Sequence, residues 1–180
     1  MSKILITGGS GYIGSQIATH MLKSSYDVHV LVRANSNLIL LRNIKLAINI
    51  HVVDGSLQNL ISIIRNIKPS VVIHTAAYSL INHNEGDIED LIKSNILFPV
   101  NLLEAMVKNK IYNFINTASF WQNYKNEKYS PVNLYASTKE AFETISRYYF
   151  EATPLKMITL KLFDTYGIDD PRGKIFNQLG

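Results

Sequence analysis

Short apolar runs alternate along the chain with longer stretches in which apolar residues recur every three or four positions. The short runs are typical of buried strands and the longer stretches of amphipathic helices, because side chains repeat every second residue in a strand and every 3.6 residues in a helix. The expected strands are residues 4–7, 28–32, 48–53, 71–73, 114–115 and 157–162. The first expected helix begins at residue 13 and ends near 23–25, and a short helix is expected around 38–42. The remaining expected helices are 57–67, 89–108 and 133–152.

This alternation predicts an α/β protein. Strands joined by right-handed helical crossovers build a parallel sheet that is covered by helices on both faces. We therefore expect a Rossmann-like doubly wound parallel sheet in three layers, αβα. Within the helix at 89–108, Asn95 is a polar interruption and Pro99 predicts a kink.

Composition narrows the function classes. The 180 residues can build one sizeable core, 47% of them are hydrophobic, and the absence of cysteine excludes disulfides and thiolate–metal sites. The net charge of +4 is mild and the lysines are dispersed, so we expect no nucleic-acid partner. The apolar runs are too short to cross a bilayer, and the chain enters a strand at once without a signal peptide. We expect a cytoplasmic protein with no membrane partner and no metal site.

A glycine-rich segment, residues 3–14, follows the pattern strand, turn, helix. A helix N-terminus presents unpaired N–H groups and a partial positive charge, which attract a pyrophosphate. Gly8 would permit the tight turn, Gly11 would let the backbone approach the phosphates, and Gly14 would let helix and strand pack closely. The spacing is G-x-x-G-x-x-G rather than the usual G-x-G-x-x-G. We predict a dinucleotide site here; the alternative is a turn without a ligand.

Two residues at strand ends bear on the choice of dinucleotide. Arg33 directly follows the second strand, where an acidic residue would bind the ribose 2′-hydroxyl of NAD and an arginine accommodates the 2′-phosphate of NADP. Arg33 therefore favours NADP(H) over NAD(H), although it could be an ordinary solvated loop charge. Asp54 follows the third strand and could either bind the adenine amino group or cap the next helix.

The fourth strand runs into His74, Thr75, Ala76 and Ala77. The small side chains of Ala76 and Ala77 would let a cofactor lie against the backbone. For His74 we favour a packed, hydrogen-bonded role over catalysis.

Candidate chemistry lies near the end of the fifth strand and on the last long helix. Tyr135 and Lys139 are four residues apart, so they share one helix face. A nearby ammonium lowers the pKa of a phenol, which would bring Tyr135 toward working pH as an acid–base group. Ser119 leaves the fifth strand and could hydrogen-bond the same substrate oxygen. Alone, the Y-x-x-x-K spacing is also typical of a solvated helix face.

Taken together, the motifs resemble the extended short-chain dehydrogenase/reductases of the nucleotide-sugar type, the NAD-dependent epimerase/dehydratase family. The matching segments are TGGSGYIG at 7–14, HTAA at 74–77, Ser119, YASTK at 135–139 and LFDTYG at 162–167. The resemblance implies an NAD(P)-dependent oxidoreductase with Ser119, Tyr135 and Lys139 as its catalytic residues. The expected cofactor contacts are Gly8, Gly11, Tyr12, Ile13, Gly14, Arg33, Asp54, Ala76, Ala77, Asn95, Tyr135 and Lys139.

Within that family the chain is similar to bacterial reductases of CDP-4-keto-dideoxyhexoses, the CDP-abequose and CDP-paratose synthases. Phe120 and Trp121 follow Ser119, where the dehydratases carry an Asp-Glu pair, so elimination of water is not expected. We expect NADPH-dependent reduction of a nucleotide-linked 4-keto-6-deoxy or 3,6-dideoxy hexose in polysaccharide (O-antigen) biosynthesis, with an activity that truncation of the substrate-binding region impairs. The alternatives are an NAD-dependent 4-epimerase and an inactive cofactor-binding fragment.

The resemblance also bears on domains and assembly. Family members continue into a further strand and a small substrate-binding domain, so residues 1–167 are expected to form the NAD(P)-binding domain and 168–180 the start of a truncated substrate-binding region. Members often dimerise through their long helices, here 89–108 and 133–152. The residues considered for such a contact, with core packing as the favoured alternative, are Leu103, Val107, Phe142 and Tyr149.

Overall fold

The computed structural model of the chain describes residues 1–167 and 170–172. Within these residues, six parallel strands form one sheet in the order β3-β2-β1-β4-β5-β6. After β3 the chain returns to the other side of β1, and the remaining strands are added there in the opposite direction across the sheet. This strand order is that of a doubly wound dinucleotide-binding fold. The predicted fold class is therefore confirmed. The strands are β1 Lys3–Thr7, β2 Asp27–Arg33, β3 Asn49–Val53, β4 Val71–His74, β5 Asn113–Ser119 and β6 Lys156–Leu162.

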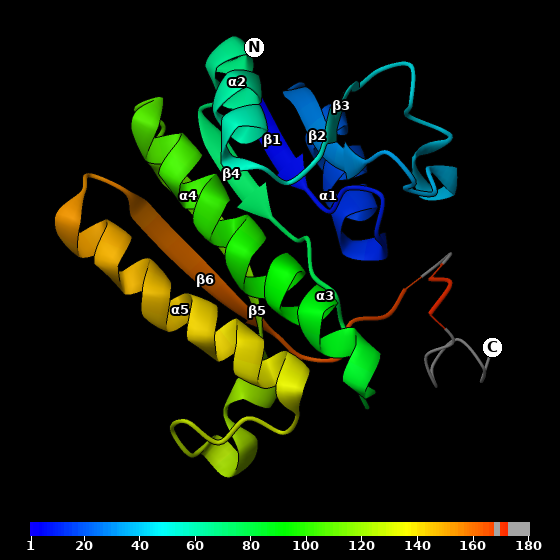
Figure 1. The fold of residues 1–180 in the computed structure, drawn as a ribbon. Coiled ribbons are helices and arrows are strands. Elements are labelled where there is room, and N and C mark those ends of the chain that lie inside the picture. The colour runs from blue at the N-terminus through cyan, green and yellow to red at the C-terminus, as the bar shows by residue number, and fades with distance from the viewer. Residues whose placement is uncertain (168–169, 173–180) are drawn as a thin grey trace.

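Helices cover both faces of the sheet. In Figure 1, α2, α4 and α5 lie in front of the strands and α1 lies behind them. The side chains of β1 alternate accordingly: Leu5 packs in the core cluster under α2 and α4, while Ile4 and Ile6 pack with Ala18 of α1. The helices are α1 Tyr12–Lys23, α2 Leu57–Ile67, α3 Ile88–Ile92, α4 Phe98–Lys108 and α5 Leu134–Ala152, and the segment predicted as a short helix around 38–42 is one 3₁₀ turn, Ile39–Leu41.

The helix predicted for residues 89–108 is interrupted. A π-helical turn, Lys93–Leu97, separates α3 from α4, and Pro99 lies in the first turn of α4. Proline lacks the N–H of a regular helix, and its ring clashes with the carbonyl four residues earlier, here that of Asn95. The wider turn relieves this conflict and carries Asn95 into the protein interior.

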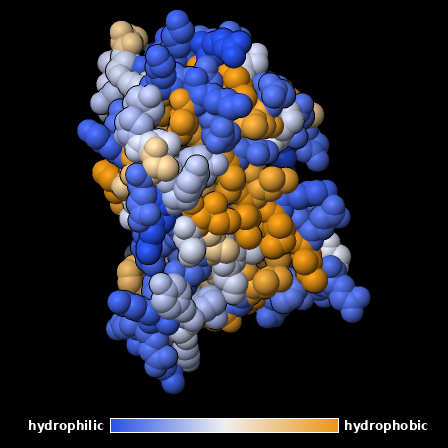
Figure 2. All heavy atoms as spheres, turned by 60° about the vertical axis from the view of Figure 1, so that its left-hand side comes forward, coloured by the Kyte–Doolittle hydropathy of each residue, from blue (hydrophilic) through white to orange (hydrophobic). Residues whose placement is uncertain are grey.

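The long helices present an apolar face to solvent, but not through the residues considered from the sequence. Leu103, Phe142 and Tyr149 are buried in the core and Val107 packs against it, so the favoured alternative of core packing is confirmed. Figure 2 shows the side of the molecule that carries α4 and α5, where apolar side chains gather in a band. The exposed large apolar residues of α5 are Ile145 and Tyr148, and those of the segment before α4 are Ile88 and Ile92 on α3 and Leu97 at the end of the π-helical turn.

The coverage of the sheet is incomplete at its β6 edge. The apolar side chains of Ile158 and Leu160 on β6 are 61% and 47% exposed. The expected start of a substrate-binding region, 168–180, lies outside the described residues apart from 170–172. Across the described part of the chain, no helix is both long enough and apolar enough to span a membrane.

Candidate active site

The glycine turn between β1 and α1 is sterically constrained. Gly8 has a φ of +69°, and a Cβ on it would lie 2.5 Å from the backbone nitrogen of Ala76. A Cβ on Gly14 would lie 2.3 Å from the carbonyl oxygen of Gly8. The role predicted for Gly8 in the turn is therefore confirmed, whereas Gly14 packs closely against the backbone of Gly8 and Gly9 in the turn and not against β1. Gly11 is the N-cap of α1 and donates its N–H to the Gly8 carbonyl oxygen over 3.0 Å.

One further glycine of this turn had no role in the sequence argument. A Cβ on Gly9 would come within 2.2 Å of Cγ1 of Val30, which is buried on β2. Gly9 therefore lets the turn pack on the neighbouring strand. The spacing of glycines cannot reveal this, because the contact depends on a side chain from another part of the chain.

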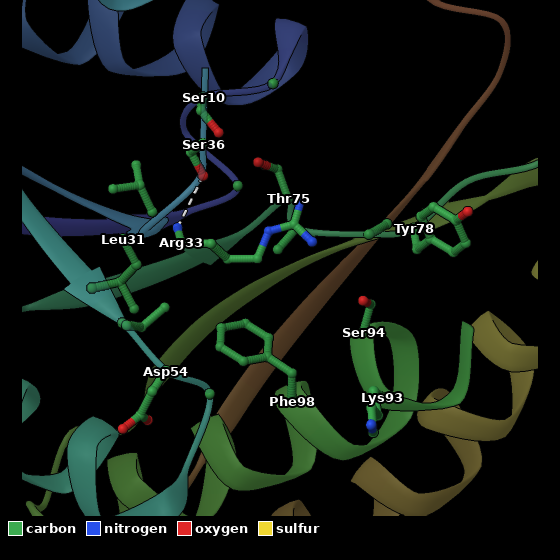
Figure 3. A pocket seen from close by; sticks show the side chains of 17 residues that line it. Ser10, Leu31, Arg33, Ser36, Asp54, Thr75, Tyr78, Lys93, Ser94 and Phe98 are labelled. Atoms are coloured by element: carbon green, nitrogen blue, oxygen red, sulfur yellow. Dashed lines mark hydrogen bonds between the residues drawn. The ribbon is translucent and has the colours of Figure 1, made fainter. Parts of the chain in front are cut away.

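A cavity of about 380 Å³ opens beside the glycine turn, over the C-terminal ends of β1 to β4. In Figure 3 the Arg33 side chain extends into it below Thr75, and the ring of Phe98 lies on the opposite wall. Ser10 and Ser36 lie at the same end as the start of Arg33, and the Ser36 hydroxyl accepts the Arg33 N–H over 3.0 Å. The predicted cofactor residues that line this cavity are Gly8, Gly11, Arg33, Asp54, Ala76 and Ala77.

Asp54 stabilises the start of the following helix. Its carboxylate accepts the Ser56 N–H over 2.8 Å, and this bond lowers the pKa of Asp54. In Figure 3 its side chain points away from the centre of the cavity. The capping role considered for Asp54 was wrong, because Ser56 is the N-cap of α2 and Asp54 only accepts the N–H of that cap residue. Contact with an adenine stays a prediction.

A second cavity, of about 220 Å³, continues from the first. The two share Gly8, Gly11, Thr75 and Ala77, so they meet at the glycine turn. Ser119 and Tyr135 both line the second cavity, although 16 positions separate them in the sequence. The other predicted residues that line it are Tyr12, Ile13, Gly14 and Ala77.

Ser119 is held in a turn that begins a 3₁₀ helix, Phe120–Gln122. Its Oγ accepts the Trp121 N–H over 3.2 Å, and its own N–H donates to Oε1 of Gln122 over 2.8 Å. The hydroxyl hydrogen of Ser119 is not used in either bond. It can therefore be donated to a ligand in the cavity.

The pKa of Tyr135 moves in the direction opposite to the one expected. Burial raises the pKa of this phenol, and its hydrogen bond with the Ser79 side chain offsets only part of the increase. The expected lowering by Lys139 was wrong for the protein without ligand, because desolvation of the phenol outweighs any stabilisation of the phenolate. Tyr135 is consequently protonated at neutral pH.

Lys139 lies in the interior, 2% exposed, one helical turn from Tyr135. Burial lowers the pKa of its ammonium from 10.5 to about 8, and the charge of Glu143 opposes this decrease. Lys139 does not line either cavity.

This buried charge predicts an unusual dependence of stability on pH. Between pH 8 and pH 10.5 the unfolded chain retains a proton on Lys139 that the folded chain has lost, so stability rises with pH in this window. Below pH 8 both states are protonated and the penalty is present in full. We expect the free energy of unfolding to gain about 2 kcal/mol from this group between pH 7 and pH 9.5.

In Lys139→Met this gain should disappear and the stability at pH 7 should increase. Urea unfolding at the two pH values measures both effects, with Lys108→Met on the surface of α4 as the control. If the free energy of unfolding of Lys139→Met rose between pH 7 and pH 9.5 as much as that of the wild-type chain, the assignment of this rise to a buried ammonium at Lys139 would be contradicted.

His74 has the packed role favoured from the sequence. It is fully buried, its Nδ1 lies 2.7 Å from Oγ1 of Thr7, and three phenylalanine rings surround it at centroid distances of 5.9 to 6.0 Å. Burial and the charge of Lys139 hold the pKa of His74 well below its usual range. A neutral imidazole in this position stabilises the core.

Asn95 was expected to contact the cofactor, but it lines neither cavity. The side chain is 1% exposed; it accepts the Tyr78 N–H and donates to the Tyr78 carbonyl and to Thr138. A direct contact is thus not supported by the geometry. Asn95 instead fixes the loop after β4, whose Tyr78 lines the first cavity.

Sequence reasoning missed several lining residues. Trp121 and Arg172 line the second cavity, and the Arg172 guanidinium lies 4.8 Å from the centre of the Tyr12 ring. Arg172 also donates to Asp170 and to Thr165. The apolar periodicity of the sequence gives no sign of these two residues, because Trp121 follows β5 and Arg172 follows β6, and they meet only in the folded chain. In the first cavity the missed residues include Ser10, Ser36, Thr75 and Phe98.

A family model described as the NAD dependent epimerase/dehydratase family matches residues 4–178. Among curated proteins, a CDP-abequose synthase of Salmonella muenchen is 29% identical over 96% of this chain and 56% of its own length. A UDP-glucose 4-epimerase of Mycoplasma pneumoniae is 26% identical over 98% of this chain and 56% of its own length. The chain spans about half the length of the curated relatives it matches.

Solved structures of the same fold include a UDP-glucose 4-epimerase with UDP-glucose from Thermotoga maritima. It has a TM-score of 0.83 and 23% identity, over 92% of this chain and 56% of that one. A Thermus thermophilus UDP-glucose 4-epimerase in complex with NAD has a TM-score of 0.77 and 25% identity, over 88% of this chain and 54% of that one.

Proposed function

The chain belongs to the NAD dependent epimerase/dehydratase family, and from this premise we propose that it carries the cofactor half of an NADPH-dependent reductase. The substrate would be a nucleotide-linked 4-keto-6-deoxy or 3,6-dideoxy hexose, as used in O-antigen biosynthesis. The observation that carries the proposal is the second cavity, where Ser119 and Tyr135 face the same space at the end of the glycine turn. The similarity to CDP-abequose synthases supports the sugar class.

The residues beside the glycine turn fit a dinucleotide. Gly8 and Gly11 place no side chains beside the N-terminus of α1, and the first turn of α1 contains no acidic residue that would repel a pyrophosphate. The adenosine part would occupy the first cavity, and the nicotinamide would occupy the second, beside Tyr135. When bound, the cofactor supplies the hydride.

The chain's own residues would manage the proton. Tyr135, whose pKa is raised by burial, holds a proton at neutral pH and would donate it to the oxygen of the reduced ketone. Ser119 would donate its hydroxyl hydrogen to the same oxygen and orient it. Lys139, one turn away, would stabilise the phenolate that remains. A protonated Tyr135 suits reduction, because the reverse reaction needs this residue as a base.

Arg33 supports the preference for NADPH. It extends into the first cavity from the end of β2, and Ser10 and Ser36 line the same cavity with hydroxyl groups. A 2′-phosphate could accept hydrogen bonds from all three side chains. The end of β2 carries no carboxylate that would favour the 2′-hydroxyl of NAD.

Replacing Arg33 by alanine should weaken NADPH binding by about tenfold or more, since hydrogen bonds to charged groups contribute roughly 1.5–3 kcal/mol. NADH binding should change little. Fluorescence titration of both cofactors measures the ratio of the two Kd values, with Arg42→Ala on the exposed surface as the control. Equal weakening of both cofactors, or of neither, would count against a 2′-phosphate site.

The test of the reaction is to mix the purified chain with NADPH and a CDP-linked 4-keto-3,6-dideoxyhexose, and to follow NADPH oxidation and the sugar product. Stoichiometric oxidation with formation of the 4-hydroxy sugar is expected. Interconversion of two sugar epimers with NAD, without net oxidation, would instead support a 4-epimerase. NADPH binding without any turnover would support a cofactor-binding module.

We also infer a homodimer through the apolar band on α4 and α5. Ile145 and Tyr148 of α5 are exposed there together with Leu97, the N-cap of α4, and a band of this kind is typical of a protein contact. A second copy could cover it by pairing the same helices in a two-fold arrangement.

A further inference from the structure

Gln122 is a buried side chain that is hydrogen-bonded at both ends. It is fully inaccessible to solvent; its Oε1 accepts the Ser119 N–H over 2.8 Å, and its Nε2 donates to Oε2 of Glu140 over 2.7 Å. Burying a primary amide is costly unless its polar atoms find partners, and a bond to a carboxylate is stronger than one between neutral groups. The side chain therefore links two parts of the chain in one orientation.

The linked parts are those that carry the candidate chemistry. Ser119 begins the turn after β5, while Glu140 directly follows Lys139 on α5. The Val132 N–H also donates to the Trp121 carbonyl oxygen over 2.9 Å, so the turn is held to the segment before α5 as well. Without the Gln122–Glu140 bond, the Val132–Trp121 bond would still hold this turn, but the side chain that accepts the Ser119 N–H would lose its own anchor on α5.

We propose that Gln122 and Glu140 are positioning residues that hold the Ser119 hydroxyl toward Tyr135 in the second cavity. This inference rests on the proposed role of Ser119 in the reaction. Gln122 acts through the backbone of Ser119, and Glu140 acts by fixing the orientation of the Gln122 amide. Neither residue lines the cavity, so neither is assigned a contact with substrate.

An exchange of the two residue types tests the link. Gln122→Glu replaces the amide donor with a carboxylate that faces the Glu140 carboxylate, so the link should open. When Glu140→Gln is added, the amide at position 140 donates to the carboxylate at position 122. That carboxylate can then also accept the Ser119 N–H, so both hydrogen bonds of the wild-type chain have a counterpart. The matched controls are Gln58→Glu on the surface of α2 and Glu151→Gln at the exposed end of α5.

Two readouts do not depend on turnover. Hydrogen exchange of the Ser119 amide should accelerate by about two- to tenfold in Gln122→Glu, because repulsion from the Glu140 carboxylate moves the acceptor at position 122 away from the Ser119 N–H, and a hydrogen bond contributes roughly 0.5–1.5 kcal/mol. Trp121 is the only tryptophan of the chain and lies in the same turn. Acrylamide should therefore quench its fluorescence more strongly in Gln122→Glu than in the wild-type chain. Both properties should return toward wild type in the double variant Q122E/E140Q.

The catalytic readout separates positioning from general stability. In folded Gln122→Glu, kcat for NADPH oxidation should fall while the Kd for NADPH stays near that of the controls. The thermal unfolding midpoint should fall as well, because two carboxylates then face each other at a buried site, and the double variant should recover both kcat and the midpoint. The proposed link would be contradicted if Gln122→Glu kept the wild-type rate of Ser119 hydrogen exchange and the wild-type quenching of Trp121. It would also be contradicted if the double variant showed the same exchange and quenching as the single variant. An opened link with wild-type kcat would overturn the positioning role.

If the wild-type chain shows no turnover, the proposed function fails separately. The exchange and quenching measurements then decide whether Gln122 and Glu140 hold the Ser119 turn.

Discussion

Replacing Tyr135 by phenylalanine is expected to lower kcat for NADPH oxidation by about 10²–10⁴, the usual contribution of a positioned general acid. The ring keeps its place in the wall of the second cavity, and only the proton that would reach the ketone oxygen is lost. The Kd for NADPH should therefore remain within about twofold, because a phenol hydroxyl that bonds the substrate contributes little to cofactor affinity.

Steady-state kinetics and a cofactor titration on the same preparation measure these two quantities. Tyr26→Phe, which removes a phenol hydroxyl remote from both cavities, is the control and should leave kcat unchanged. A Tyr135→Phe chain with nearly full turnover would remove Tyr135 as the proton donor. Loss of NADPH binding in this variant would point to a structural role instead.

Replacing Gly8 by alanine is expected to abolish saturable NADPH binding. The positive φ of Gly8 costs an alanine about 1–2 kcal/mol, and the added Cβ would also meet the Ala76 backbone at 2.5 Å. Backbone atoms cannot rotate away as a side chain can, so the turn must move relative to the end of β4. Both cavities contain Gly8, and both should therefore change shape.

Thermal unfolding with and without NADPH measures the effect. The wild-type chain should gain about 2.7 kcal/mol at a ligand concentration of 100 times Kd, and Gly8→Ala should gain nothing. The control is Gly86→Ala, because nothing lies within 4 Å of a Cβ at that position. A folded Gly8→Ala chain that is stabilised as strongly as wild type would show that the cofactor does not use this turn.

Much of the fold follows from the local pattern. The alternation of apolar runs with helical periodicity predicts six parallel strands with helices on both faces of the sheet, because crossovers have one handedness. The role of Gly8 also follows, since it depends on the turn itself. The interruption at Lys93–Leu97 is only partly foreseeable: Pro99 indicates a break, but the π-helical turn depends on how Asn95 bonds Tyr78 and Thr138.

The site is less predictable than the fold, because its properties arise from burial and from distant contacts. The spacing of Tyr135 and Lys139 indicates a shared face, but the direction of the Tyr135 pKa shift depends on how deeply the phenol is buried. Gln122 appears in the sequence as an ordinary polar loop residue. Its importance becomes visible only when Glu140, 18 positions away, is seen to accept its amide N–H.

The most direct test of the whole account is a calorimetric titration of the purified wild-type chain with NADPH. The account predicts saturable binding at a single site, tighter for NADPH than for NADH and absent in Gly8→Ala. A folded wild-type chain that binds neither cofactor would contradict it, because the crevice over the glycine turn would then have no dinucleotide to hold beside Ser119 and Tyr135.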